Sequence, residues 1–414
     1  MRISTEFLPR GENAAIEEAV SVARIRISVG QQNATDMRLG RQNALNDHII
    51  APAYPLAEGM SYRWWTLIYG RGRTTALRSM RAGFALPNIF IKPVGNNTIE
   101  VHCEPFVYDN PAISFVTKAT ELVATKTFEN NMSQFLDAVV NRLRDEKIAD
   151  TPLSIRRSAI TESTADPEQY EFCKAAGAFG IDPYTCTDEI ASFIENATAT
   201  FEGDDLEEFL AGVTAETGKN AIAWLQDAEQ HPDDWFTLPA IENCRREIRY
   251  RKTSGAPWTA GYDSARKARD VLHYGESEPV GTFTALAARL GNARFRATEG
   301  SSTSLRGVSR LRPGKPQAIV SGNRHPASLL FAMVRTFGDA IHFGSAHHSP
   351  VTDRIGTYRQ QLGRAFAAEF LAPIDAIKDM RSRGEAIEDI ADHFGVSDRV
   401  IGHQIENRDV SWLA

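Results

Sequence analysis

The sequence has few cysteines and no long apolar run. Its four cysteines, Cys103, Cys173, Cys186 and Cys244, are scattered along the chain, and no two have the spacing of a CxxC pair. A thiolate zinc site and a disulfide framework are therefore not expected. We expect buried, reduced thiols instead. No apolar segment approaches the ~20 residues that a membrane helix needs, and the N-terminus lacks the charged-then-apolar order of a signal peptide. We expect a cytoplasmic protein without a membrane-spanning segment.

The sequence also lacks the short motifs of two common enzyme classes. There is no Gly-x-Ser-x-Gly elbow, which would present a nucleophilic serine. Segments 71–75 and 312–315 contain glycine and basic residues but are too short for a Gly-x-x-x-x-Gly-Lys-Ser/Thr phosphate loop. Neither serine hydrolysis of that type nor nucleotide chemistry is predicted.

The composition is that of a globular protein and excludes disordered and fibrous classes. The 414 residues include 42% hydrophobic and 24% charged side chains, with a formal net charge of -7. The charge is segregated along the chain. Residues 121–243 carry 25 acidic and 8 basic side chains, whereas residues 289–370 carry 4 acidic and 12 basic ones. We expect the basic stretch either to dock against the acidic block or to bind nucleic acid.

The order of predicted elements gives an α/β (α+β) fold in three parts. Residues 1–150 form an N-terminal α/β domain, 166–243 an acidic helical connector, and 256–414 a C-terminal domain, with a polar linker over 151–165. Within the first part, the hydrophobic periodicity predicts helices over 12–23, 54–69 and 129–143 and strands over 24–29, 88–92 and 98–102.

Two features of these parts have alternative interpretations. The aromatic residues around Trp64 and Trp65 suit a stacking platform or a packed core, and core packing is favoured because few basic residues accompany them. The acidic segment 202–208 lacks the ligand spacing of an EF-hand calcium loop, so a solvated helix N-terminus is predicted there.

The most specific segment of the chain is 358–373, which reads Tyr-Arg-Gln-Gln-Leu-Gly-Arg-Ala-Phe-Ala-Ala-Glu-Phe-Leu-Ala-Pro. It closely resembles the second metal-site helix of the ImmA/IrrE family of zinc metallopeptidases. In that family a glutamate ligand precedes Ala-Asn-x-Phe-Ala-Ala-x-Leu-Leu-Met-Pro. A helix starting near Phe331 similarly resembles the family's Phe-Thr-x-Ala-His-Glu-x-x-His helix. The resemblance covers about residues 256–414 and implies a zincin-like domain.

The chain departs from the family pattern at every metal-site position. In the matching register, Arg335 and Asp339 stand at the two histidine positions, Thr336 at the catalytic glutamate and Gln360 at the third ligand. A permanent cation opposes Zn²⁺, and threonine is no general base near neutral pH. We therefore expect no catalytic residues and no cofactor, with Arg335 and Asp339 paired at i and i+4. The candidate ligand-binding residues are Arg335, Asp339, His342, Arg359 and Arg364.

A shifted zinc site is the alternative. Asp339 and His342 lie at i and i+3 of one predicted helix, and His347 and His348 follow closely. Carboxylate and imidazole together are a legitimate zinc ligand set. Against this site, no acidic residue is placed to activate a bound water, and solvated or capping histidines are commoner.

The segment 385–406 has the pattern of a helix-turn-helix, with the turn glycine at Gly395. A DNA-binding interpretation directs Asp398, Arg399, Gly402 and His403 toward a groove. Residues 371–414 carry an excess of acidic side chains, and neutralising phosphates supplies most DNA affinity. We therefore favour a packing role for this helix pair.

The ImmA/IrrE resemblance implies a function by analogy. Members are intracellular proteases that cut helix-turn-helix repressors in stress responses and mobile genetic elements. A chain that keeps the fold without the ligands is expected to be a regulatory pseudopeptidase that binds a protein client, such as a helix-turn-helix repressor, in bacterial stress response or phage defence. The alternatives are an active zinc endopeptidase with a rearranged site and a nucleic-acid-binding regulator that uses the basic stretch 289–370.

Overall fold

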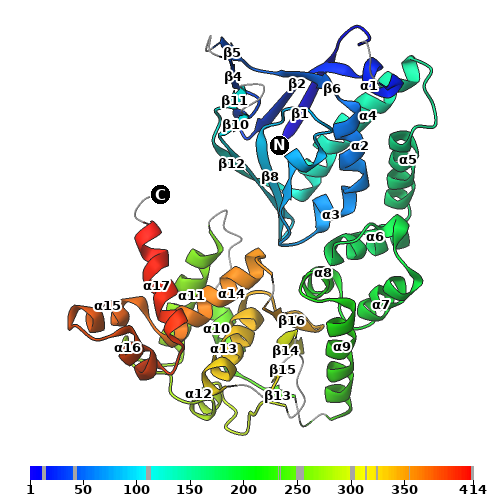
Figure 1. The fold of residues 1–414 in the computed structure, drawn as a ribbon. Coiled ribbons are helices and arrows are strands. Elements are labelled where there is room, and N and C mark those ends of the chain that lie inside the picture. The colour runs from blue at the N-terminus through cyan, green and yellow to red at the C-terminus, as the bar shows by residue number, and fades with distance from the viewer. Residues whose placement is uncertain are drawn as a thin grey trace. The chain divides into compact units, whose positions relative to one another are not determined.

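A computed structural model of the chain divides into two compact units, Met1–Ile194 and Glu195–Ala414 (Figure 1). The structure describes residues 1–11, 15–40, 44–108, 113–231, 233, 235–248, 256–298, 304–312, 315–322, 325–353 and 355–411. Helices and small antiparallel sheets occur in both units, which confirms the predicted mixed α/β class. Over these residues, no helix combines the length and the apolar character needed to cross a membrane.

Over its described residues, the N-terminal unit contains three small antiparallel sheets with orders β1-β2-β3 (with β6 also on β2), β10-β11-β4-β5 and β12-β9-β8-β7. The strands are β1 (Arg2–Phe7), β2 (Val22–Val29), β3 (Gln32–Asn33), β4 (Met37–Leu39), β5 (Ala44–Asn46), β6 (Ile49–Pro52), β7 (Thr75–Ala76), β8 (Asn88–Gly95), β9 (Thr98–Glu104), β10 (Phe106–Tyr108), β11 (Ile113–Phe115) and β12 (Ala119–Ala124). The helices are α1 (Ile16–Val20), α2 (Tyr54–Tyr62), α3 (Trp64–Tyr69), α4 (Thr125–Asp145), α5 (Pro152–Ala165) and α6 (Pro167–Phe179), and α7 (Asp188–Thr198) begins in this unit.

The three strands predicted in this unit are confirmed by β2, β8 and β9. The predicted helices over 54–69 and 129–143 correspond to α2 with α3 and to α4. The predicted helix over 12–23 is too long. Helix α1 covers only Ile16–Val20, residues 12–14 lie outside the described part, and Val22 already pairs with Pro52 in the sheet.

The tryptophan pair is part of the core, as predicted. Trp64 and Trp65 are both almost fully buried, and Tyr54 and Tyr69 are buried with them, whereas Tyr62 is exposed. Tyr69 stacks on Trp65 with ring centroids 5.9 Å apart. These rings are therefore not available as a platform for a base.

The linker predicted over 151–165 is wrong, because this segment is helix α5. Thr151 caps it by accepting a hydrogen bond from the backbone N–H of Ser154 at 3.2 Å, and Pro152 occupies the first turn. Leu153 and Ile160 are buried in the core of the N-terminal unit. A polar segment thus becomes a helix because a cap, a proline and two apolar residues at helical spacing act together.

The acidic segment 166–243 spans the boundary between the two compact units. Its first part, up to Ile194, belongs to the N-terminal unit and the rest to the C-terminal unit.

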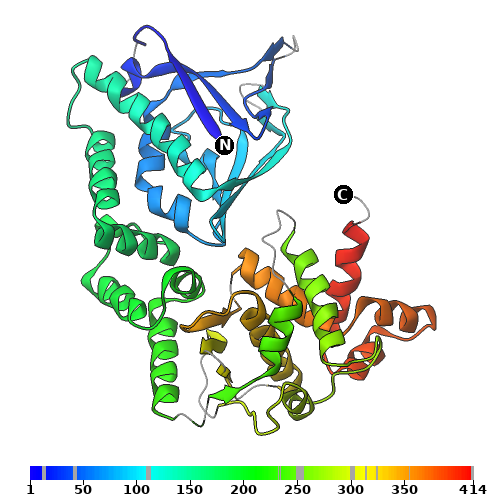
Figure 2. The same cartoon turned by 180° about the vertical axis from the view of Figure 1, so that it is seen from behind.

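The C-terminal unit has one antiparallel sheet, of order β13-β15-β14-β16, with helices packed around it. Its strands are β13 (Phe236–Thr237), β14 (Leu305–Arg312), β15 (Lys315–Val320) and β16 (Ser349–Thr352). Its helices are α8 (Gly203–Ala211), α9 (Ala215–Gln230), α10 (Ala240–Glu247), α11 (Pro257–Val271), α12 (Phe283–Arg289), α13 (Pro326–His342), α14 (Tyr358–Leu371), α15 (Ile374–Ser382), α16 (Ile387–Phe394) and α17 (Asp398–Ser411). Both views show α14 beside α11 and α13 (Figures 1 and 2).

Glycines allow the three central helices to approach closely. A Cβ at Gly338 of α13 would lie 2.5 Å from Phe366 of α14, and a Cβ at Gly261 of α11 would lie 2.6 Å from the carbonyl oxygen of Leu362. The second contact is with backbone, which cannot rotate away. The α11–α14 spacing therefore requires glycine at position 261.

This requirement gives a first prediction. Gly261→Ala should lower the free energy of unfolding by about 1–3 kcal/mol, because the added methyl group overpacks the helix interface. Urea denaturation of the full chain measures the effect. Gly402→Ala is the matched control, because a Cβ there would meet nothing within 4 Å. An equal loss in both variants would contradict the steric explanation.

Candidate functional site

Helix α13 carries two buried charged residues on one face. Arg335 and Asp339 are one helical turn apart, and each is less than 5% exposed. The helix starts with Pro326 in its first turn, and the His325 side chain accepts a hydrogen bond from the backbone N–H of Ala327. Buried charges are stable only when they are paired and hydrogen-bonded, so their partners define the site.

Asp339 is paired with Arg359 of α14. The guanidinium donates two parallel hydrogen bonds to the carboxylate, from Nε at 2.6 Å and from Nη2 at 2.7 Å. Its Nη1 donates to Asp205 of α8 at 2.6 Å, and Ser349 of β16 donates to both carboxylates. Burial alone would lower the pKa of Arg359, but Asp339 and Asp205 outweigh burial and hold this pKa well above its ordinary value. This closed group is called the Arg359 cluster.

Arg335 has different partners. It forms an ion pair with Asp353, which also pairs with Arg306, and it donates to the Thr352 carbonyl oxygen and to Oε1 of Gln360, both at 2.5 Å. Burial lowers the pKa of Arg335 below its ordinary value, and Asp353 acts in the opposite direction. The predicted Arg335–Asp339 pair is therefore wrong, because α14 and the segment after β16 supply each charge with its own partner.

Gln360 links this arginine to helix α8. Its Nε2 donates to Oε1 of Glu208 at 2.9 Å, and the same oxygen accepts from Thr357 at 2.5 Å. Thr357 also caps α14, since its hydroxyl oxygen accepts from the backbone N–H of Gln360 at 3.2 Å. Glu208 is fully buried and Asp205 nearly so. The helix N-terminus predicted over 202–208 is present and residues 202–204 are exposed, but Asp205 and Glu208 are buried because α8 directs these carboxylates toward the basic helices.

Thr336 has a packing role. Its hydroxyl donates to the carbonyl oxygen of Ala332 at 2.9 Å within the same helix. A Cβ at Gly307 of β14 would clash with this hydroxyl. The Thr336 side chain therefore lies against the sheet.

The alternative zinc ligands do not come together. Asp339 belongs to the Arg359 cluster, His342 contacts Ser264 at 2.9 Å, His347 pairs with Glu202, and His348 contacts Glu229 at 3.0 Å. Within the part of the chain that the structure describes, there is no group of three or more metal-binding side chains.

His342 is largely buried and carries a second prediction. Burial lowers its pKa from 6.5 to about 4, with a smaller contribution from the positive charge of Arg245. Between pH 7 and pH 5 the unfolded chain therefore binds a proton at this imidazole that the folded chain does not. This one group should reduce the free energy of unfolding by about 2 kcal/mol over that interval.

The measurement compares urea denaturation of the protein and of His342→Gln at both pH values. The glutamine variant should lose about 2 kcal/mol less stability on acidification. Substitution of the exposed His347 by glutamine is the control. Parallel pH curves for the protein and the His342 variant would refute the prediction.

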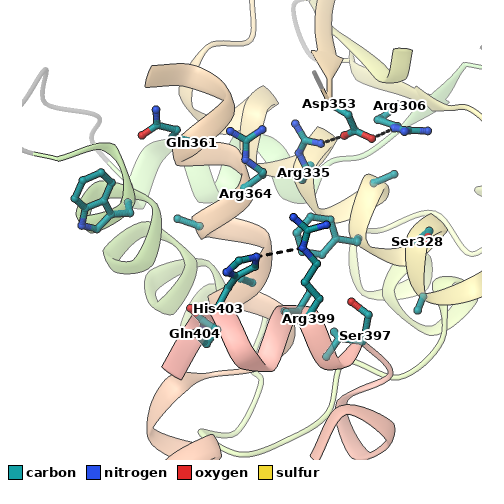
Figure 3. A pocket seen from close by; sticks show the side chains of 18 of the residues that line it. Arg306, Ser328, Arg335, Asp353, Gln361, Arg364, Ser397, Arg399, His403 and Gln404 are labelled. Carbon is teal, nitrogen blue, oxygen red and sulfur yellow. Dashed lines mark hydrogen bonds and ion pairs between the residues drawn. The ribbon is translucent and has the colours of Figure 1, made fainter. Parts of the chain in front are cut away.

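A cavity of about 860 Å³ opens beside Arg335, between α11, α13, α14 and α17 (Figure 3). Its charged lining residues are Arg306, Arg335, Asp353, Arg364 and Arg399. Of the candidate ligand-binding residues, Arg335 and Arg364 line it, whereas Asp339, His342 and Arg359 do not. The structure thus places Asp339 and Arg359 in the buried Arg359 cluster and Arg335 and Arg364 at the cavity, whereas His342 belongs to neither.

Helix α17 forms one wall of this cavity. Arg399 and His403, which a DNA-binding interpretation directs toward a groove, line it together, and Arg399 Nε donates to His403 Nε2 at 3.2 Å (Figure 3). Ile401 is fully buried, and Gln404 donates to the Glu369 carboxylate of α14 at 3.1 Å. The helix pair thus packs on the domain, as predicted.

Two basic residues of the stretch 289–370 pair with the acidic block inside the C-terminal unit. Arg359 binds Asp205, and Arg310 forms a 2.5 Å ion pair with Glu229 of α9. These ion pairs join the basic stretch to the part of the acidic block from residue 195 onward.

Sequence reasoning missed the carboxylates that hold the two arginines. Asp205, Glu208 and Asp353 were not among the candidate residues, although the charge segregation already paired an acidic block with a basic one. A spacing of three between Asp205 and Glu208 on a helix, next to the apolar pair Phe209 and Leu210, is the signal that could have placed them on a buried face.

Comparison with known proteins does not add an identity to this geometry. No family model, no curated protein and no solved structure matches the chain.

Proposed function

We propose that the chain is a catalytically inactive, ImmA/IrrE-like pseudopeptidase that acts in the cytoplasm as a regulatory or sensor protein through protein–protein binding. The support is the sequence resemblance of α13 and α14 to the family's two metal-site helices, together with the residues that these helices now carry. By the same resemblance, the client is a helix-turn-helix repressor and the setting is bacterial stress response or phage defence.

The single observation that carries the proposal is that the side chains at positions 335, 339 and 360 are held by buried ion pairs and hydrogen bonds. Arg335 donates to Gln360, and Asp339 accepts from Nε and Nη2 of Arg359. A guanidinium offers no lone pair to a metal, and two buried cations beside the site oppose Zn²⁺. The residues present therefore do not fit a zinc ion.

Metal analysis tests the inactive state. The full chain, purified without chelator and dialysed against a metal-free buffer, should contain far less than one zinc per chain. Its thermal midpoint should be the same with EDTA and with added Zn²⁺, because no folded-state site gains binding energy. One tightly bound zinc per chain that is lost in Asp339→Asn would overturn the proposal.

Binding of a client tests the regulatory role. Helix-turn-helix repressors from the genome that encodes this chain are each mixed with the full chain, and both association and intact mass are followed. The expected result is a complex in which the repressor keeps its full length. Cleavage of the repressor would establish the peptidase alternative, and absence of a complex would contradict the proposed partner.

A further inference from the structure

The cavity beside Arg335 has a strong excess of positive charge. Four arginines line it with one carboxylate, Asp353, which is already shared by Arg306 and Arg335. Over the described residues, Arg364 and Arg399 have no carboxylate within ion-pair distance. Low-dielectric walls strengthen the field of such charges, so the cavity attracts an anion.

Arg364 is the central residue of this argument. It is half-buried on α14, and among the described residues its two terminal nitrogens donate to the carbonyl oxygen of Ile355 alone, at 3.3 and 3.2 Å. Burial, with the repulsion of Arg335, lowers the pKa of Arg364 to about 10, so it is still a cation at neutral pH. A desolvated cation without a counter-ion is costly, and a bound anion would offset this cost.

Arg399 approaches the same space from the opposite wall. Figure 3 shows its side chain extending from α17 toward the arginines of α13 and α14. Guanidinium groups on two walls suit an anion with several oxygen atoms, because each planar fork can donate two parallel hydrogen bonds to a phosphate.

The rest of the lining is apolar and aromatic. Phe331, Ala365 and Val400 contribute apolar surface, and Trp258, which is 46% exposed, lies at the α11 side. A volume of about 860 Å³ is within the range of small-molecule sites and exceeds what a bare inorganic anion requires. An aromatic side chain in the same cavity as several cations suits a ligand with a flat ring and a charged group.

We propose that this cavity binds a nucleoside phosphate, with its phosphates between Arg364 and Arg399 and its base against Trp258. An acidic peptide would also meet the arginines, but its carboxylate side chains offer no flat ring to stack on Trp258, so the nucleotide is favoured. Binding is proposed without hydrolysis. The nucleotide would be the ligand that the protein detects as a sensor, and this role rests on the proposed function.

Such a ligand would tie the helix-turn-helix-like pair to the peptidase-like helices. Arg364 is on α14 and Arg399 on α17, so phosphates held by both would add a link between elements that Gln404 and Glu369 already join. The position of α17 would then depend on whether the nucleotide is bound.

The test is calorimetric titration of the full chain, without Mg²⁺ and at low salt, with ATP, GTP, CTP and UTP, and with adenosine and inorganic tripolyphosphate as partial ligands. At least one nucleotide should bind about tenfold or more tightly than either partial ligand. Arg364→Met and Arg399→Gln should each weaken that binding by about tenfold or more. Trp258→Ala should weaken nucleotide binding while leaving tripolyphosphate unchanged.

The controls keep the result interpretable. Arg383→Met removes an exposed arginine that does not line the cavity and should leave binding unchanged. Arg399 is exposed, so its variant should fold even if the Arg364 variant did not. Tripolyphosphate binding as tightly as every nucleotide, unaltered affinity in both arginine variants, or tighter binding of a polyglutamate peptide would each overturn the inference. Repressor binding without any nucleotide binding would overturn this inference alone and leave the proposed function standing.

Discussion

Replacing Arg359 by leucine is expected to lower the free energy of unfolding by about 3–5 kcal/mol, because it breaks a buried ionic group on one side only. The variant leaves the Asp339 and Asp205 carboxylates buried near one another with no cation between them. Urea denaturation of the full chain gives the loss. Hydrogen exchange of the α13 and α14 amides assigns that loss to the C-terminal unit.

An exposed arginine of the same unit supplies the matched control. Arg383 pairs with Glu385 at 3.0 Å, and its side chain is 62% exposed. Because solvent screens such a pair, Arg383→Leu should cost no more than about 1 kcal/mol. Equal losses in the two leucine variants would mean that burial of the Arg359 cluster does not contribute to stability.

The sequence was most informative where one physical signal acts locally. Alternation predicted β2, and helical spacing predicted α4, because each pattern describes a single element burying one face. The α13 and α14 segments were likewise recognisable as helices with buried polar positions. The segregated charge also carried real information, since Asp205 and Glu229 of the acidic block hold Arg359 and Arg310.

The failures concern partners that are distant along the chain. The i, i+4 rule paired Arg335 with Asp339 because it considers one helix by itself. In the folded unit, Asp353 and Arg359 reach these side chains with short, charge-assisted hydrogen bonds, which are stronger than a pair across one helical turn. Helix α5 was missed because its polar composition hid a cap and two core residues.

Arg359 and Arg335 have different environments, and this difference separates stability from binding. Arg359 is enclosed by carboxylates and a serine and does not line the cavity, whereas Arg335 lines it beside Arg364. Variants of Arg359 should therefore change stability with little effect on ligand affinity. Arg364 has no carboxylate partner among the residues described, so its variants should change ligand affinity with little effect on stability.

Replacing the whole Arg359 cluster by apolar residues should restore most of what the single substitution removes. In the triple variant Asp205→Leu, Asp339→Leu and Arg359→Met, no charge is left buried without a partner. Exchange of a complete buried ionic group for apolar side chains of similar volume is often neutral or stabilising. We therefore expect the triple variant to regain about 3 kcal/mol relative to Arg359→Leu in the same urea denaturation.

The outcome distinguishes two reasons for the presence of the cluster. If stability returns in the triple variant and repressor binding is unchanged, the cluster only satisfies a polar centre that has no metal. If stability returns but repressor binding is lost, the cluster positions α8 and α14 for the client. A triple variant as unstable as Arg359→Leu would contradict the expected compensation, because Ser349 and the backbone around it would then need the charges as hydrogen-bond partners.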